Sequence, residues 1–303
     1  MRNKMEKKNG DRTEGHMQKI RRVCPRIHCI TNYVTAQSVA NIVLAAGASP
    51  IMASGVHEVE DVTGICDALV INIGTLDERT IPSMILAGKK AAELGHPIVF
   101  DPVGVGASVF RRETALRILA EVPVTVIRGN GSEIRILLEA QSKQKAEKVT
   151  AEQTGRCGID ASESDLAKSE NAESKAEIAA KLAIQQQCIV VMTGEVDIVT
   201  DGKRLCMIEN GHPWMGRITG SGCMLDGILA AFLAACPKTF SERLAASAWA
   251  VAAHGICGEM AYEKTAARSG GTGSFYCFFM DAMSLLEDET LEERAKMFWR
   301  ERQ

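Results

Sequence analysis

The strongest constraint on the fold is an alternation of short apolar runs with longer segments of helical periodicity. Buried strands are expected at the apolar runs 27–30, 69–73, 97–100, 124–127 and 188–192. Helices are expected between these runs, at 36–46, 81–94, 111–121 and 132–139. Such alternation is typical of βαβ units, which build a parallel sheet with helices on both faces. The sequence therefore predicts a three-layer α/β/α fold with a mostly parallel central sheet.

The pattern changes after residue 192. Two short strands, at 198–200 and 204–208, flank the dipeptide Asp201-Gly202, which is a signal for a hairpin turn. Beyond them lie long, apolar and alanine-rich segments that predict helices at 221–235, 241–262 and 273–286. We see no internal repeat and expect a single domain over residues 23–303 of the 303.

Two segments stand apart in composition. Residues 1–22 are polar and charged, and we expect them to form a disordered N-terminal extension. Residues 141–177 are rich in Lys, Glu, Ser and Ala and contain no aromatic residue. Because the βα pattern resumes after them, we expect a charged insertion, either a solvated helix or a mobile segment.

Composition excludes several classes of function. Thirty-five basic and 38 acidic residues give a net charge of -3, whereas nucleic-acid and anionic-membrane binders carry a basic surplus. The aromatic content of 5% argues against a stacking platform for single-stranded nucleic acid. Ten cysteines without a CxxC pair or zinc spacing favour reduced thiols. With neither a secretory signal nor an apolar stretch long enough to span a membrane, we expect a cytoplasmic protein.

Ligands of open α/β sheets bind beyond the carboxyl ends of the strands, so the segments that follow the strands are the candidate site. The most informative is the Thr-Gly-Ser-Gly stretch at 219–222, which opens a helix. Its glycines allow close approach of a ligand, and the free N–H groups of the helix start can bind phosphate. Cys223 would lie in the same positive field, which favours a thiolate that could act as a base. The alternative is an ordinary glycine-rich cap with a buried cysteine.

Polar residues after the other strands extend this site. Asp101 and Glu133 could organise Mg²⁺, although a turn residue and a first-turn helix acid are equally good explanations for them. Arg128 ends an apolar strand beside glycines and is a candidate anion ligand. Asn32 and Met52 carry the weakest signals, because Asn is common in turns and Met is common in cores.

The ordered set of motifs resembles one family. HCITNYV, NIVLAAGASPIM, VINIGTL, VFDPVGVGAS, IRGNGSEI, VVMTGEVDIVTDG, NGHP and ITGSGCM follow one another as in hydroxyethylthiazole kinase, a member of the ribokinase-like superfamily. The late segment GTGSFYCFFMDAM is similar to the closing helix of that family. The resemblance covers residues 27–286 except the charged insertion.

The resemblance implies an ATP- and Mg²⁺-dependent kinase that phosphorylates the hydroxyl of 4-methyl-5-(2-hydroxyethyl)thiazole for thiamine biosynthesis or salvage. It implies a catalytic Cys223, at a position that most ribokinase-like enzymes fill with Asp. The other roles it implies are thiazole contacts for Asn32, Met52 and Gly220, nucleotide contacts for Arg128, Thr193 and Gly222, and metal binding for Asp101 and Glu133. It further implies a homotrimer with active sites at subunit interfaces, with no nucleic-acid or membrane partner.

The sequence departs from the family pattern in three places. The insertion at 141–177 is longer than the usual connection, the stretch after Met52 is less acidic, and Asp226 replaces a small uncharged residue. Asp226 lies one helical turn after Cys223, where it could disfavour the thiolate or act as a second acid. Two rival functions remain: a pyridoxal or hydroxymethylpyrimidine kinase, which should carry Asp at position 223, and a non-catalytic binding protein. A non-catalytic binding protein is disfavoured, because the chain keeps all four polar residues of the candidate nucleotide and metal site: Asp101, Arg128, Glu133 and Thr193.

Overall fold

A computed structural model describes residues 15–151, 172–236 and 239–302 of the chain. Within them the strands form one sheet in the order β2-β1-β3-β4-β5-β6-β7-β8-β9. Neighbours from β2 to β6 are parallel, and neighbours from β6 to β9 are antiparallel. The strands are β1 (Arg26–Ile30), β2 (Ser49–Ile51), β3 (Ala68–Asn72), β4 (Ile98–Asp101), β5 (Val126–Asn130), β6 (Ile189–Thr193), β7 (Asp197–Thr200), β8 (Arg204–Ile208) and β9 (Met297–Glu301).

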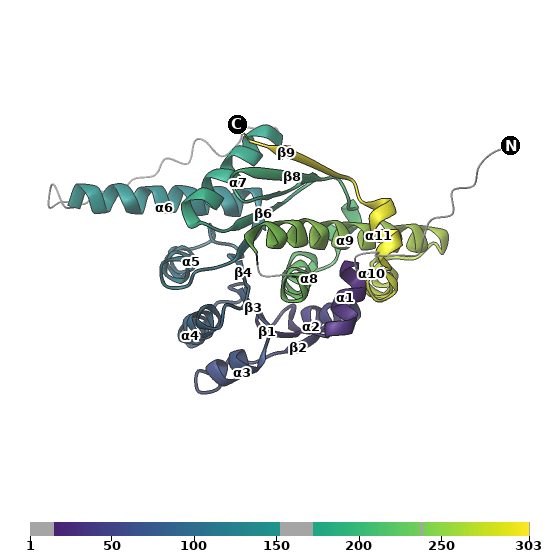
Figure 1. Cartoon of the computed structure of the whole chain (residues 1–303), viewed down its shortest axis with the longest axis horizontal. Coiled ribbons are helices and arrows are strands. Elements are labelled where there is room, and N and C mark those ends of the chain that lie inside the picture. The colour runs from purple at the N-terminus through teal and green to yellow at the C-terminus, as the bar shows by residue number, and fades with distance from the viewer. Residues whose placement is uncertain (1–14, 152–171, 237–238, 303) are drawn as a thin grey trace.

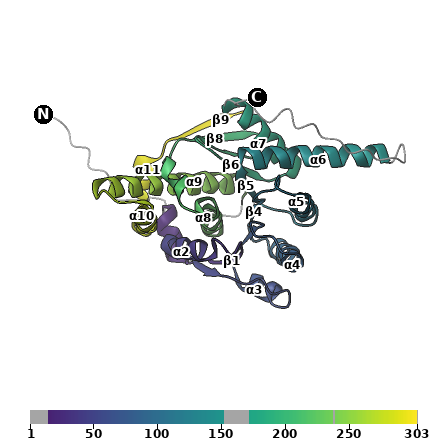
Figure 2. The same cartoon turned by 180° about the vertical axis from the view of Figure 1, so that it is seen from behind.

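Helices cover both faces of this sheet, as Figures 1 and 2 show. One layer consists of α3 (Val59–Ile65), α4 (Thr80–Glu93), α5 (Val109–Glu121), α6 (Gly131–Ala151) and α7 (Ala172–Gln186). The other consists of α1 (His16–Val23), α2 (Ala36–Ala46), α8 (Ser221–Ala235), α9 (Phe240–Ala267), α10 (Thr272–Leu285) and α11 (Asp288–Arg294). The predicted three-layer α/β/α fold is confirmed.

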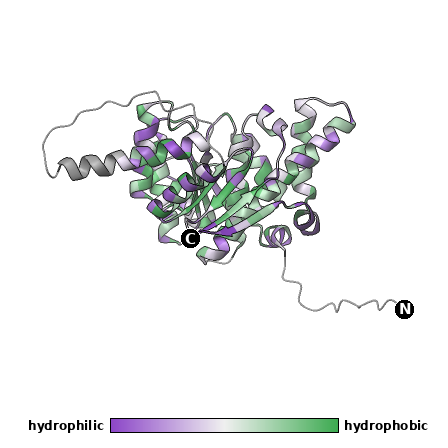
Figure 3. Cartoon of the chain, turned by 90° about the horizontal axis from the view of Figure 1, so that it is seen from above, coloured by the Kyte–Doolittle hydropathy of each residue, from purple (hydrophilic) through white to green (hydrophobic). Residues whose placement is uncertain are grey.

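The apolar strands are buried on both faces because successive side chains point to opposite helical layers. In β3, Leu69 and Ile71 belong to the core under α3–α7, whereas Val70 belongs to the core under α2 and α8–α10. Figure 3 shows the hydrophobic strands between helices that carry hydrophilic residues on their outer sides. The parallel arrangement brings the carboxyl ends of β1 and β3–β6 to the same edge of the sheet.

Most of the expected elements are present within a few residues of their predicted bounds. Asp201-Gly202 forms the expected hairpin turn between β7 and β8, and Gly202 has the left-handed φ of 90° that favours glycine. Helix α7 and four short elements, β2, α3, α11 and β9, were not predicted. The short elements have no long apolar run that would have indicated them. Among the described residues no helix is both long enough and apolar enough to cross a membrane.

The prediction of a disordered extension over residues 1–22 is wrong for its last seven residues, which belong to α1. The carboxylate of Asp288 accepts hydrogen bonds from the backbone N–H groups of Met17 and Gln18 at 2.8 and 2.9 Å, and so caps this helix. Met17 and Ile20 are fully buried against the core. The extension at residues 1–14 lies outside the described residues.

The prediction of a charged insertion at 141–177 is wrong at both of its ends, which are parts of the helical layer. Helix α6 continues to Ala151, and α7 begins at Ala172. Gln141 is buried and accepts a hydrogen bond from Gln186 Nε2 at 2.8 Å, and Ala176 is buried in the core. Residues 152–171 lie outside the described residues.

These contacts predict that replacing all of 141–177 by a short Gly/Ser linker lowers the melting temperature by several degrees. The replacement removes the Gln141–Gln186 hydrogen bond and the apolar contacts of Ala176. Replacing only 152–171 is the matched control, since it removes none of the described contacts. Thermal unfolding of the two variants checks this, and equal melting temperatures would contradict it.

Candidate active site

Polar side chains converge at the carboxyl edge of the sheet, beneath the start of α8. Asn32 follows β1, Asn72 ends β3, Asp101 ends β4, and Arg128 lies in β5. Because these four strands are adjacent in the sheet, residues from distant parts of the chain meet at one place. All four side chains are buried, and the first turn of α8 brings Cys223 to them.

Gly220 allows this close approach of α8 to the sheet. It is the N-cap of the helix, with a left-handed φ of 80°. A Cβ atom at this position would lie 2.6 Å from Thr35 Cγ2, so a larger residue would collide with the loop after β1. Cys223 therefore sits in the first turn of α8, half-buried, in the positive field of the helix N-terminus.

Two asparagine amides point at the sulfur of Cys223. The Nδ2 atoms of Asn32 and Asn72 each donate to Sγ at 3.3 Å, and Asn32 Nδ2 also donates to Asn72 Oδ1 at 3.1 Å. Two N–H donors on one sulfur stabilise negative charge there. Asn72 was not singled out from the sequence. Its signal was a polar residue near the end of an otherwise apolar strand.

Below the sulfur lies a buried ion-pair cluster, which consists of Arg128 between Asp101 and Asp226. Arg128 Nε donates to Asp226 Oδ1 at 2.8 Å, and Nη2 donates to Asp226 Oδ2 at 3.1 Å and to Asp101 Oδ2. Burial raises the pKa of Asp101 well above its ordinary value; Arg128 opposes this rise and Asp226 adds to it. Burial alone would lower the pKa of Arg128, but the two carboxylates raise it well above its usual value.

The buried cluster has an unsatisfied oxygen that could hold a cation. Asp101 Oδ1 is buried and has no hydrogen-bond partner. Ligand atoms of Asp101, Cys223 and Asp226 all lie within 4.8 Å of one another. When both carboxylates are ionised they outnumber the one guanidinium, and a divalent cation would offset the excess negative charge.

Glu133, the second predicted metal ligand, is engaged elsewhere at the same edge. Its Oε1 accepts from the backbone N–H of Gly104 at 2.8 Å, and its Oε2 accepts from that of Asn130 at 2.9 Å. Glu133 thus ties the loop after β4 to the start of α6. Its role as a metal ligand stays a prediction.

A cavity of about 690 Å³ opens beside Gly222, on the side of β6 and α9. Its lining includes the predicted nucleotide residues Thr193 and Gly222, together with Ser221 and His254. His254 Nε2 donates to the backbone carbonyl of Ser221 at 3.0 Å and so anchors the start of α8. Burial lowers the pKa of His254 to about 4, which keeps the ring neutral at neutral pH.

Met52 lies in the loop after the edge strand β2, and none of the contacts described for this cluster involves it. It is 41% exposed, and the loop after β1 exposes Tyr33 and Val34 on the same edge of the sheet. The structure therefore brings Asn32, Gly220 and Cys223 together, whereas no described contact joins Met52 to them.

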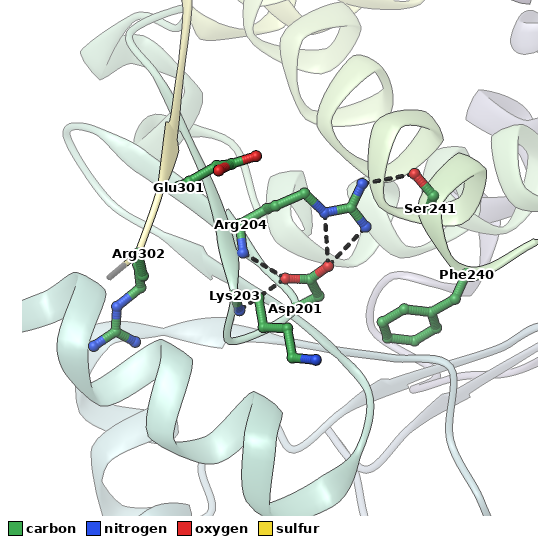
Figure 4. Close-up of a pocket in the computed structure, with 7 residues that line it drawn as sticks. All are labelled: Asp201, Lys203, Arg204, Phe240, Ser241, Glu301 and Arg302. Carbon is green, nitrogen blue, oxygen red and sulfur yellow. Dashed lines mark hydrogen bonds and ion pairs between the residues drawn. The ribbon is translucent and has the colours of Figure 1, made fainter.

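A second cavity, of about 630 Å³, lies at the opposite edge of the sheet, around the β7–β8 turn (Figure 4). None of the predicted site residues lines it. One of its lining cations, Arg204, is already paired with Asp201 at 2.8 Å and bonded to Ser241 Oγ at 2.6 Å. This second cavity therefore has no part in the candidate site.

The contact between Gly222 and Arg128 predicts that Gly222→Ala weakens nucleotide binding by about tenfold or more. A Cβ atom at position 222 would lie 2.7 Å from Arg128 Nη1, so the guanidinium would have to leave its place. Gly216→Ala is the matched control in the same loop, because its Cβ atom would meet nothing within 4 Å. Calorimetric titration with ADP and Mg²⁺ measures the dissociation constant for ADP of each variant. Equal constants for Gly222→Ala and Gly216→Ala would contradict the expectation.

The site geometry can be compared with known proteins. The family model of the hydroxyethylthiazole kinase family matches residues 17–289. The hydroxyethylthiazole kinase of Clostridium beijerinckii is 44% identical over 281 residues, which are 93% of this chain and 95% of that protein. The hydroxyethylthiazole kinase of Ruminiclostridium cellulolyticum is 42% identical, with the same coverage.

Solved structures support the same family and its fold. The hydroxyethylthiazole kinase protein of Pyrococcus horikoshii OT3 superposes with a TM-score of 0.78 at 35% identity, over 94% of this chain and 98% of that one. A ribokinase-like superfamily protein of Enterococcus faecalis V583 superposes with a TM-score of 0.54 at 15% identity, over 91% and 92% of the two chains. The second likeness concerns the fold alone, and it confirms the expected ribokinase-like architecture.

Proposed function

This chain belongs to the hydroxyethylthiazole kinase family, and from that premise we propose that it phosphorylates 4-methyl-5-(2-hydroxyethyl)thiazole with ATP. The observation that carries the proposal is the placement of Cys223 in the first turn of α8, between two amide donors and the cavity beside Gly222. A proton acceptor thus lies next to an anion-binding helix start, which is what phosphoryl transfer to an alcohol requires.

We assign Cys223 the removal of the proton from the attacking hydroxyl. The amides of Asn32 and Asn72 hold its sulfur and stabilise the charge that it carries before the proton arrives. The N–H groups of the first turn of α8 receive the charge of the transferred phosphoryl group. Thr193 and Gly222 line the cavity that would take the nucleotide, and the guanidinium of Arg128 lies against Gly222.

Asp101 fits the Mg²⁺ that the family pattern implies. Its Oδ1 is a buried carboxylate oxygen without a partner, and oxygen ligands of this kind are what Mg²⁺ prefers. Glu133, the other metal ligand implied by the family pattern, would contribute once one of its backbone hydrogen bonds is released. The bound ion would neutralise charge on the phosphates.

The thiazole would lie on the other side of Cys223, near Asn32 and Gly220. Met52 is exposed and makes no described contact with these residues, and this supports a homotrimer in which a partner subunit completes the pocket. The adjacent loops after β1 and β2 expose large apolar side chains that would become buried in such an interface. They are Tyr33 (82% exposed), Val34 (56%), Met52 (41%) and Val56 (39%). Light scattering of the purified chain measures the oligomeric state, and a monomer would overturn this part of the proposal.

An ATP-consumption screen across thiazole, pyrimidine and pyridoxine alcohols tests the proposed substrate. We expect turnover with hydroxyethylthiazole that requires Mg²⁺. Robust turnover only with hydroxymethylpyrimidine or pyridoxine would assign the chain to another kinase of this fold. Thiazole binding without turnover would favour a non-catalytic protein. Roles in thiamine biosynthesis or salvage and a cytoplasmic location stay predictions.

A further inference from the structure

Asp226 is a fully buried carboxylate one helical turn after Cys223. A buried charge is costly unless its partners compensate for it, so its partners indicate its role. Both of its oxygens are engaged: Oδ1 accepts from Arg128 Nε at 2.8 Å, and Oδ2 accepts from Arg128 Nη2 and Asn72 Nδ2, each at 3.1 Å. No hydrogen bond joins it to Cys223 among the described residues. Both oxygens of Asp226 are thus held by Arg128 and Asn72 rather than directed at Cys223.

The pair between Asp226 and Arg128 is bidentate, through the Nε–Nη2 edge of the guanidinium. Two parallel N–H···O bonds hold this planar group in one orientation, which a single bond to Asp101 would not do. The second hydrogen of Nη2 is used by Asp101 Oδ2. The orientation of Arg128 is thus determined mainly by Asp226.

The remaining nitrogen of Arg128 points toward the anion-binding loop. Nη1 donates to no residue in the described part of the chain. It would lie 2.7 Å from a Cβ atom at position 222, which places it against Gly222 in the first turn of α8. Gly222 itself lines the cavity that we assign to the nucleotide. Nη1 therefore lies against a residue of the helix start that lines this cavity.

We propose that Asp226 is a positioning residue that orients Arg128 so that only Nη1 faces the phosphates of the nucleotide. This inference rests on the proposed kinase function, because it concerns the nucleotide side of the same site. Without the carboxylate, the guanidinium can rotate and pair with Asp101 through any of its nitrogens. Its donors are then no longer preorganised for phosphate, and nucleotide affinity falls.

Equilibrium binding of ADP with Mg²⁺ to the full-length chain tests the proposal. Asp226→Asn keeps the size of the side chain but places a donor opposite Arg128 or Asn72. We expect the dissociation constant for ADP to rise about tenfold. The dissociation constant for hydroxyethylthiazole should stay within about twofold, since no contact joins Asp226 to Asn32 or Gly220. Ile228→Val, a change in the buried face of α8 away from Arg128, is the control for altered packing and should leave ADP affinity unchanged.

The decisive readout is the coupling between the two residues. In a chain that already carries Arg128→Lys, adding Asp226→Asn should weaken ADP binding by less than about twofold, because no guanidinium remains to be oriented. The proposal would be overturned if Asp226→Asn lowered ADP affinity equally with and without Arg128→Lys. Unchanged ADP affinity in Asp226→Asn alone would also overturn it. Asp226→Thr leaves Asp101 and Arg128 as a balanced pair, so it replaces Asp226→Asn if that variant fails to fold. A wild-type chain that binds ADP but phosphorylates another alcohol would overturn the proposed substrate and leave this proposal standing.

Discussion

Replacing Cys223 by alanine is expected to lower kcat by about 10²–10⁴-fold, the usual contribution of one positioned proton acceptor. The substitution removes the sulfur at which Asn32 and Asn72 point, and with it the group that takes the hydroxyl proton. Affinity for the thiazole should be nearly unchanged, because proton removal matters mainly in the transition state. Steady-state kinetics with direct binding of hydroxyethylthiazole measures both quantities. A variant with near wild-type kcat would reassign Cys223 to packing beneath the anion loop.

Cys223→Asp is the companion to this experiment. A carboxylate is charged at neutral pH without help, and the two asparagine amides can donate to it as they do to sulfur. We therefore expect kcat to be retained or raised. Asp101 and Asp226 lie in the same cluster and would repel a third carboxylate, so kcat at saturating ATP should be higher when Asp226→Asn is also present.

Asp101→Asn is expected to lower kcat by about 100-fold or more and to raise the Mg²⁺ concentration needed for half-maximal rate. The change removes the one buried carboxylate oxygen that has no partner among the described residues, and it weakens the pair with Arg128. Measuring the rate of phosphoryl transfer against Mg²⁺ concentration checks the prediction. An unchanged requirement for Mg²⁺ would exclude Asp101 as a metal ligand.

Glu133→Gln provides the comparison, because Glu133 makes two backbone hydrogen bonds and has no unpartnered buried oxygen. Gln retains one acceptor oxygen, so the loop after β4 should stay in place. If Glu133 binds the metal, this variant should also raise the Mg²⁺ requirement. If it only ties the two loops together, thermal stability falls and the Mg²⁺ requirement stays as in the wild type.

Elements with strong local signals were predictable. The apolar runs of β3 and β6 have no other way to bury their side chains than a sheet covered on both faces. The glycines around Ser221 indicated a close approach of the chain, and Gly220 does have the left-handed φ of a residue without Cβ. Helix α1 was not predictable, because the residue that caps it, Asp288, is 271 positions away from Met17.

The sequence by itself determined which strand ends and which helix start carry chemical groups. Cys223, Asp101 and Arg128 were found in this way, because turns, caps and apolar runs depend on neighbours along the chain. Only the tertiary structure decided which of these groups meet. Asn72 and Asp226 are 154 positions apart and touch because strand order places β3 beside β4 and α8 above both. The partners of a buried charge depend on that packing, since burial requires each charge to be compensated by groups within hydrogen-bond reach.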